Sequence, residues 1–244
     1  MKSIYLVREL LFPFGCGYCG EALLSGDESY FGICEKCRSF LNSRIMQSQS
    51  CAICGRELIS EKAICLLCRK ESVDSSDEFN KWILKAKLLF PYTGNYKKML
   101  GAYKFNKSIG IANFFVDCLI LSMNALLTGE SDASWVPVPP RPGRIKAQGW
   151  DQIGHIAGLL EKRPGNSIQV CRCLRRLPSR SQKELNREER KINIKGKILC
   201  HKAPPKTAVI FDDVFTTGAT LNACARALKE AGTEKVFGIC LYYD

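Results

Sequence analysis

Eight of the fourteen cysteines of this 244-residue chain form four Cys-x-x-Cys pairs near its N-terminus, and they constrain the fold more than any other feature. A Cys-x-x-Cys turn places two sulfur atoms on one side of a tight loop. Two such turns supply four sulfur ligands, each about 2.3 Å from one tetrahedral Zn²⁺ ion. We therefore predict two structural zinc ions in this segment. The predicted ligands are Cys16, Cys19, Cys34, Cys37, Cys51, Cys54, Cys65 and Cys68.

The spacing of the pairs bears on which cysteines share an ion. Fourteen residues separate the first two pairs and ten separate the last two, and these short spacers favour sequential pairing, as in a double zinc ribbon. Interleaved pairing is the alternative. Disulfides would require an oxidising compartment, and a thioredoxin-like redox motif has one such pair rather than four. Gly20 and Gly55 directly follow Cys19 and Cys54, where the turn often requires a positive φ.

The other six cysteines are scattered along the rest of the chain. Cys224 and Cys240 fall in apolar patterns, which predicts that they are core residues rather than reactive thiols. Cys171 and Cys173 are two residues apart, a spacing that would place both side chains on one side of a strand. The sequence shows no metal partner set for them.

A second stretch, AVIFDDVFTTGAT at residues 208–220, combines an apolar run, an acidic pair and a loop of small and hydroxyl residues. The apolar residues after it recur at helical spacing, and Gly232 follows where a helix would end. We predict a buried strand, a loop and a helix in that order. The apolar residues of the predicted helix are Leu221, Cys224, Ala225 and Leu228.

This order of elements predicts a ligand site. A buried strand delivers Asp212 and Asp213 to the sheet edge where open α/β folds bind ligands. The loop can wrap an anion with its N–H groups and hydroxyls, and the helix N-terminus adds partial positive charge. A ligand that suits both halves carries a diol and a phosphate, as ribose 5-phosphate does. The alternative is a strand end with acidic turn residues and a threonine cap.

The rest of the chain alternates strands with helices, which predicts an α/β fold with a mostly parallel sheet. Residues 87–92 read as a strand, residues 135–140 as a strand that runs into a rigid proline turn, and residues 151–163 as a helix with an apolar face. Residues 109–127 are too polar for a membrane span and predict a core-facing helix. The polar residues 69–80 predict a linker, so we expect a zinc module at 1–75 and an α/β domain at 76–244.

The net charge of +12 is concentrated in one segment. Residues 141–206 hold 17 Lys and Arg against five Asp and Glu, so they carry a net charge equal to that of the whole chain. A basic segment of this kind suits a polyanion, either a pyrophosphate or a nucleic-acid backbone, although a solvated surface is the simpler interpretation.

The acidic stretch resembles the phosphoribosyl pyrophosphate (PRPP) loop of type I phosphoribosyltransferases, and the whole chain resembles the ComF family, which joins a zinc module to such a domain. The segments FPYTGNYKKMLGAYKF, Pro137-Val138-Pro139 and SQKELNREERKIN carry the wider resemblance. It implies that Asp212 and Asp213 hold the ribose hydroxyls and act in catalysis, and that Arg144 meets the pyrophosphate. The implied phosphate cradle is Thr216, Thr217, Gly218, Ala219 and Thr220. The implied flexible-loop residues are Gln182, Arg190 and Asn193.

The sequence departs from the family after the proline turn. The family usually has Arg-Gly-Phe-Asn-Gln, whereas this chain has Gln148-Gly149-Trp150-Asp151-Gln152. The change removes up to two units of positive charge near the expected pyrophosphate. Because the acidic pair and the cradle are intact, we expect PRPP binding to be retained.

The resemblance implies a PRPP-binding phosphoribosyltransferase that uses Mg²⁺ with PRPP, with an acceptor that the sequence does not identify. The alternative is a nucleic-acid-binding competence protein with a vestigial or regulatory PRPP site. Its expected partners are single-stranded DNA and DNA-uptake proteins, and its aromatic side chains would stack on bases, although such residues are more often core. A third option is a zinc module that docks a partner protein. We expect no membrane insertion and a cytoplasmic location. The candidate stacking residues are Tyr96, Tyr103, Trp135 and Trp150.

Overall fold

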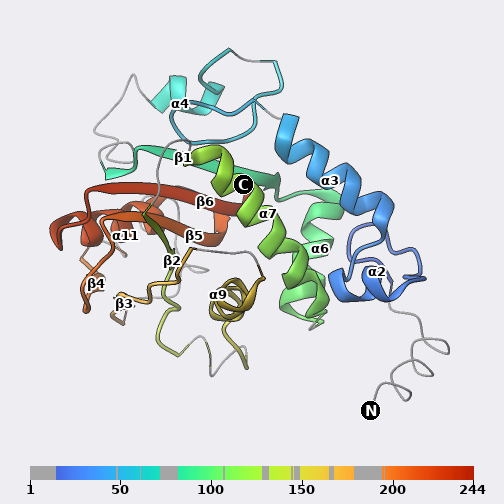
Figure 1. The fold of residues 1–244 in the computed structure, drawn as a ribbon. Coiled ribbons are helices and arrows are strands. Elements are labelled where there is room, and N and C mark those ends of the chain that lie inside the picture. The colour runs from blue at the N-terminus through green and yellow to red at the C-terminus, as the bar shows by residue number, and fades with distance from the viewer. Residues whose placement is uncertain are drawn as a thin grey trace.

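Four parallel strands form the central sheet of the computed structural model (Figure 1). Their order is β1-β6-β5-β2, with β1 at Lys85–Pro91, β2 at Ala133–Pro137, β5 at Thr207–Phe215 and β6 at Lys235–Tyr243. The structure describes residues 15–47, 49–60, 62–71, 82–106, 108–127, 132–143, 145, 149–164, 168–178, 194 and 196–244. The predicted α/β class with a mostly parallel sheet is confirmed.

Helices cover both faces of this sheet (Figure 1). Helices α6 (Gly94–Lys104), α7 (Gly110–Leu126) and α9 (Gln152–Lys162) lie on one face, and α11 (Ala219–Glu230) lies on the other. Alternate residues of β5 therefore enter different cores. Val209 and Phe211 pack in the cluster of α7 and α9, whereas Ala208 and Ile210 pack in that of α11. Burial on both sides explains the continuous apolar runs of the inner strands.

A small second sheet lies beside α11 and was not predicted from the sequence. Its strands, β3 (Leu174–Arg176) and β4 (Ile198–Cys200), pair antiparallel with Leu174 opposite Cys200.

The linker predicted at 69–80 also differs from the structure, because residues 69–71 belong to helix α4 (Leu66–Glu71). The rest of that linker, with the predicted domain boundary after residue 75, lies outside the described residues.

The N-terminal module packs directly on the α/β part of the chain. In Figure 1, α2 (Gly26–Phe31) and α3 (Glu35–Gln47) lie beside α6 and α7, and α4 lies near β1. The Asn113 side chain on α7 donates to the Tyr30 carbonyl oxygen at 2.8 Å. The Lys87 ammonium on β1 donates to the Ile45 carbonyl oxygen at 2.8 Å. Both buried clusters of the molecule include residues of this module, so its cores continue into the α/β core.

Helix α7 is the apolar segment that was predicted to face the core. Ten of its 17 residues are buried, among them Phe114, Phe115 and Leu119. Within the described ranges, the structure contains no helix whose length and hydropathy would allow it to cross a bilayer.

Candidate functional site

The eight pairing cysteines gather into two four-sulfur clusters, and the predicted sequential pairing is confirmed. In each cluster all four Sγ atoms lie within 4.8 Å of one another. A tetrahedron with metal–sulfur bonds of about 2.3 Å has sulfur–sulfur edges of about 3.8 Å. The Cys19–Cys34 distance between Sγ atoms is 3.9 Å, and the Cys54–Cys65 distance is 3.8 Å. The donor sets therefore suit one zinc ion each.

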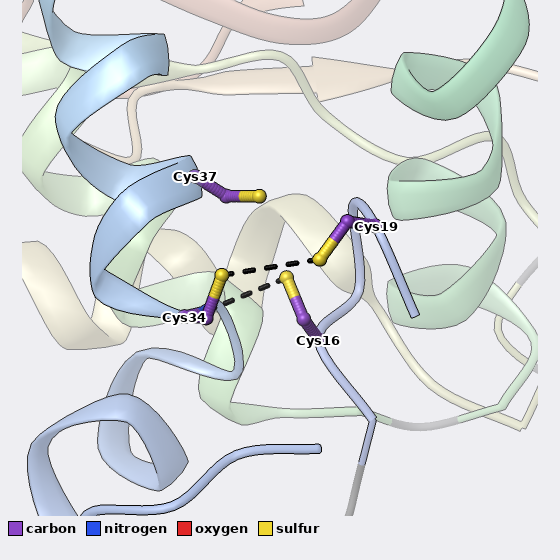
Figure 2. Close-up of side chains that lie close together, drawn as sticks. All are labelled: Cys16, Cys19, Cys34 and Cys37. Carbon is purple, nitrogen blue, oxygen red and sulfur yellow. Dashed lines mark hydrogen bonds between the residues drawn. The ribbon is translucent and has the colours of Figure 1, made fainter. Parts of the chain in front are cut away.

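Figure 2 shows how the first cluster is assembled from two elements. Cys16 and Cys19 lie on one knuckle loop, and Cys34 and Cys37 lie at the start of α3, with their sulfur atoms turned toward one another. All four ligand positions are filled by protein sulfur, which leaves no position for a substrate. Such a site stabilises a fold and does no chemistry of its own.

The two clusters share one local geometry, so the module is a structural repeat. The N–H of Gly20 donates to the Cys16 carbonyl oxygen and that of Gly55 to the Cys51 carbonyl oxygen, both at 2.9 Å. The φ angles of these glycines are 87° and 76°. The predicted positive φ after each knuckle is confirmed, and it explains why glycine stands there.

Backbone N–H groups also point at the ligand sulfurs. Cys34 N–H donates to Cys16 Sγ at 3.4 Å, and Cys65 N–H donates to Cys51 Sγ at 3.3 Å. Donation of this kind favours the thiolate, which is the form that binds metal. In the second cluster, hydrogen bonding from Cys68 lowers the pKa of the Cys54 thiol to about 5 despite its burial.

The acidic stretch forms the predicted strand, loop and helix. Strand β5 continues through both aspartates to Phe215, and α11 begins at Ala219. The strand is therefore longer than its apolar run, which ends at Phe211. Because successive side chains of a strand leave opposite faces, Asp212 and Asp213 face different surroundings.

The two carboxylates accordingly differ in their contacts. Asp213 is 7% exposed, and its Oδ2 lies 2.5 Å from the Lys104 ammonium of α6. Asp212 is less buried, and its Oδ1 accepts a hydrogen bond from the Asp213 N–H at 2.8 Å. Burial raises the pKa of the Cys224 thiol on α11, and the nearby Asp212 carboxylate raises it further.

The loop after β5 turns tightly into α11. Gly218 caps the helix with φ 72°, a conformation that side chains with a Cβ avoid. The Thr217 hydroxyl accepts from the Ala219 N–H at 3.3 Å. The 12-residue helix directs its positive dipole end at this loop. Thr216, Thr217 and Thr220 are half-buried, so their hydroxyls lie at the border of the protein and solvent.

The proline turn lies next to the acidic strand. The Val138 N–H donates to the Phe211 carbonyl oxygen at 3.1 Å, which extends the β2–β5 pairing beyond β2. The connection after β2 leads to α9 on one face, and the connection after β5 leads to α11 on the other. Adjacent strands whose connections diverge in this way bind ligands at their carboxyl ends.

Five residues implied by the family resemblance or its departures lie outside the described residues. They are Arg144, Gln148, Gln182, Arg190 and Asn193.

Asp151, one of the residues that depart from the family pattern, stabilises the start of a helix. It is the N-cap of α9, and its Oδ1 accepts from the Gly154 N–H at 3.0 Å. Asparagine can cap a helix in the same way, so the substitution changes charge without changing the cap. Part of the negative charge of Asp151 is offset by the helix N-terminus that it caps.

Two of the four candidate stacking residues are too buried to stack on a base. Tyr103 is 1% exposed and Trp135 is 0% exposed, so both are core residues. Tyr96 and Trp150 are half-buried against the same core. Trp150 meets Tyr103 edge-on with ring centroids 4.9 Å apart, and its Nε1–H donates to the Lys104 carbonyl oxygen at 3.4 Å.

Lys104 is the site residue that the sequence did not reveal. It directly follows the buried Tyr103 at the end of α6, and a lysine in the last helical turn is typical of a solvated surface. Only the contact with β5, more than a hundred residues later in the chain, shows that its charge is used inside the fold.

The predicted core positions of Cys224 and Cys240 are confirmed, and the structure adds a contact of Cys200 with Cys173 that was not predicted. Cys224 and Cys240 are buried in the core. Cys171 and Cys200 lie beside Cys173, and burial together with these neighbours raises the pKa of the Cys173 thiol. Raised pKa values keep thiols protonated, and the described residues form no third metal-ligand group beyond the two zinc clusters.

Comparison with known proteins agrees with this architecture. Residues 7–73 match the family described as "Double zinc ribbon domain". The chain is 26% identical to "Competence protein ComFC" of Streptococcus pneumoniae (strain ATCC BAA-255 / R6) over 216 residues, which cover 88% of each chain. It is also 26% identical to "Competence protein ComFC" of Bacillus subtilis (strain 168) over 236 residues, 95% of this chain and 90% of the relative. The chain is thus similar to these two ComFC proteins over about nine tenths of its length. The resemblance to the ComF family indicated by the motifs is thereby confirmed.

Proposed function

We propose that this chain binds PRPP at the carboxyl end of β5 and is a phosphoribosyltransferase-type protein. The observation that carries the proposal is the continuous run of acidic pair, small-residue loop and helix N-terminus beside the diverging β2 and β5 connections. The acidic pair can accept hydrogen bonds from a diol, and the loop with the helix N-terminus can bind an anion.

In this proposal the acidic pair accepts hydrogen bonds from the ribose 2′- and 3′-hydroxyls. The phosphate cradle, residues 216–220, holds the 5′-phosphate with its N–H groups and hydroxyls. The left-handed Gly218 brings the backbone close to the anion without a side chain in the way. Arg144, by resemblance to the family, meets the pyrophosphate, and Gln182, Arg190 and Asn193 belong to a flexible loop near it.

Mg²⁺ would be held chiefly by PRPP oxygens and would neutralise part of the pyrophosphate charge. The protein's own contribution is orientation and charge complementarity, with Asp212 and Asp213 as the proposed catalytic residues. The acceptor is not identified by any feature of the site. The two zinc ions serve the fold, and we propose the zinc module at 1–75 and the transferase-like domain at 76–244.

Handling of DNA is the second candidate function, and a cytoplasmic location suits it. Two relatives over nearly the whole chain are competence proteins, which supports a role linked to DNA uptake. The +12 charge of residues 141–206 suits single-stranded DNA as well as a pyrophosphate. On this proposal PRPP is a regulatory ligand, and competence proteins are the expected partners.

Calorimetric titration of the zinc-loaded protein with PRPP and Mg²⁺ tests the first proposal. Wild type should bind, and the Asp212→Asn/Asp213→Asn variant should not. Asp132→Asn, at an exposed position, is the control for a change of acidic charge. Unchanged affinity in the double variant would reject the assigned site. Gel retardation of single-stranded DNA at low salt, lost as salt rises, tests the second.

A further inference from the structure

Asp213 is paired inside the fold with a cation from a different element. The Lys104 Nζ lies 2.5 Å from Asp213 Oδ2, and the two side chains are 14% and 10% exposed. A buried carboxylate is costly unless a cation or several donors compensate it. Lys104 therefore compensates the charge of this carboxylate and contacts one of its two oxygens.

Lys104 also joins two parts of the candidate site. Its side chain reaches β5, while its carbonyl oxygen accepts from the Trp150 indole, which lies at the end of the segment after the proline turn. Tyr103 lies between the same two parts. Burial raises the pKa of its hydroxyl, and the carboxylates of Asp151 and Asp213 raise it further, so both carboxylates are near it.

We propose that Lys104 is a positioning residue of the ligand site, which holds the Asp213 carboxylate ionised and oriented so that it can accept hydrogen bonds from a ribose diol. This inference rests on the proposed function and deepens it. Lys104 acts through Asp213 and makes no bond to the ligand. The ion pair is made by Oδ2, so Oδ1 keeps lone pairs that a diol hydroxyl can use.

A double-mutant cycle with Mg²⁺ and PRPP as the probe tests this role. Lys104→Met should weaken PRPP binding about tenfold or more, because the buried carboxylate loses the cation that contacts its Oδ2. Lys104→Arg keeps the charge and should recover most of the affinity. Lys104→Met/Asp213→Asn should bind no more weakly than Asp213→Asn alone, because the two residues act as one unit. Lys98→Met, at an exposed position of the same helix, is the matched control.

Wild-type PRPP affinity in Lys104→Met would overturn the inference. It would also be overturned if the loss of PRPP binding free energy in Lys104→Met/Asp213→Asn equalled the sum of the losses in the two single variants. Thermal unfolding of each zinc-loaded variant accompanies the titrations. The doubly substituted protein lacks both charges of the pair and provides the reference if Lys104→Met does not fold. Absence of PRPP binding by folded wild type rejects the proposed function, and this inference with it. Wild-type binding together with an unaffected Lys104→Met rejects this inference alone.

Discussion

The backbone N–H of Leu88 donates a hydrogen bond to the carbonyl oxygen of Gly55 at 2.9 Å. This bond joins the knuckle of the second zinc ribbon to the first strand of the sheet. The Arg56 guanidinium, one residue later, donates to the Asp244 carbonyl oxygen at 2.6 Å and lies over the Tyr243 ring. The second ribbon is thus attached both to β1 and to the end of β6.

Gly55→Ala should destabilise the protein far more than Gly20→Ala. Both glycines have a positive φ, so each substitution costs about 1–2 kcal/mol of backbone strain. A Cβ at Gly55 would meet the Ala86 carbonyl oxygen at 2.2 Å, whereas a Cβ at Gly20 meets nothing within 4 Å. We expect a further loss of about 1–3 kcal/mol for Gly55→Ala. Urea unfolding of the two zinc-loaded variants measures the difference, and equal losses would contradict this packing.

Metal analysis of the purified protein should find two zinc ions per chain. Cys19→Ser and Cys54→Ser should each reduce the content to one, because each removes a ligand from a different cluster. Cys200 lies outside both clusters, so the Cys200→Ser variant should keep two zinc ions. A single substitution that released both ions would argue against two independent sites.

Asp151→Ala should lower the free energy of unfolding by about 1 kcal/mol, the usual loss for removal of an N-cap side chain. Asp151→Asn keeps the cap and should stay within a few tenths of a kcal/mol of wild type. It also removes a negative charge, so PRPP affinity should be equal or higher. Chemical denaturation and titration of both variants check this. Equal destabilisation by Asn and Ala would show that the cap contributes nothing.

His155 should make the protein less stable as the pH falls below about 6.5. Burial lowers its pKa in the folded protein, so the unfolded chain binds a proton over a pH window in which the folded chain does not. The Tyr103 hydroxyl lies 3.1 Å from Nδ1 and donates its proton to the Gln152 carbonyl oxygen, so neutral His155 must donate from Nδ1.

Urea unfolding between pH 8 and pH 5 tests the histidine effect. His155→Gln should reduce the fall in stability on acidification relative to wild type. His201→Gln substitutes the other histidine of the chain, which is exposed, and should leave the fall unchanged. Identical pH profiles for His155→Gln and wild type would contradict the prediction.

Hydrophobic periodicity and cysteine spacing correctly predicted elements that depend on residues close together in the sequence. The helix expected at 151–163 is α9 at Gln152–Lys162, and the strand expected at 87–92 is β1 at Lys85–Pro91. The zinc pairing was predictable because a spacer of 14 or 10 residues lets adjacent knuckles reach one ion.

Features that depend on distant contacts were not predictable. The apolar run of β5 ends at Phe211, yet pairing with β6 continues the strand through both aspartates. The three-residue strands β3 and β4 carry too short a pattern to be recognised. The charge of Lys104 is explained only by its partner on β5. In each case the tertiary structure supplies a neighbour that sequence periodicity does not encode.

The position of β1 at one end of the strand order has a consequence for how the chain is made. Strand β1 joins the sheet through β6, which follows it by about 150 residues, so a nascent chain has no sheet on which to seat β1 for most of its synthesis. The ribbons, by contrast, take their metal from ligands that are close in sequence. Metal loading on the ribosome would therefore produce an early folded unit, to which the last strand later brings the closing contacts.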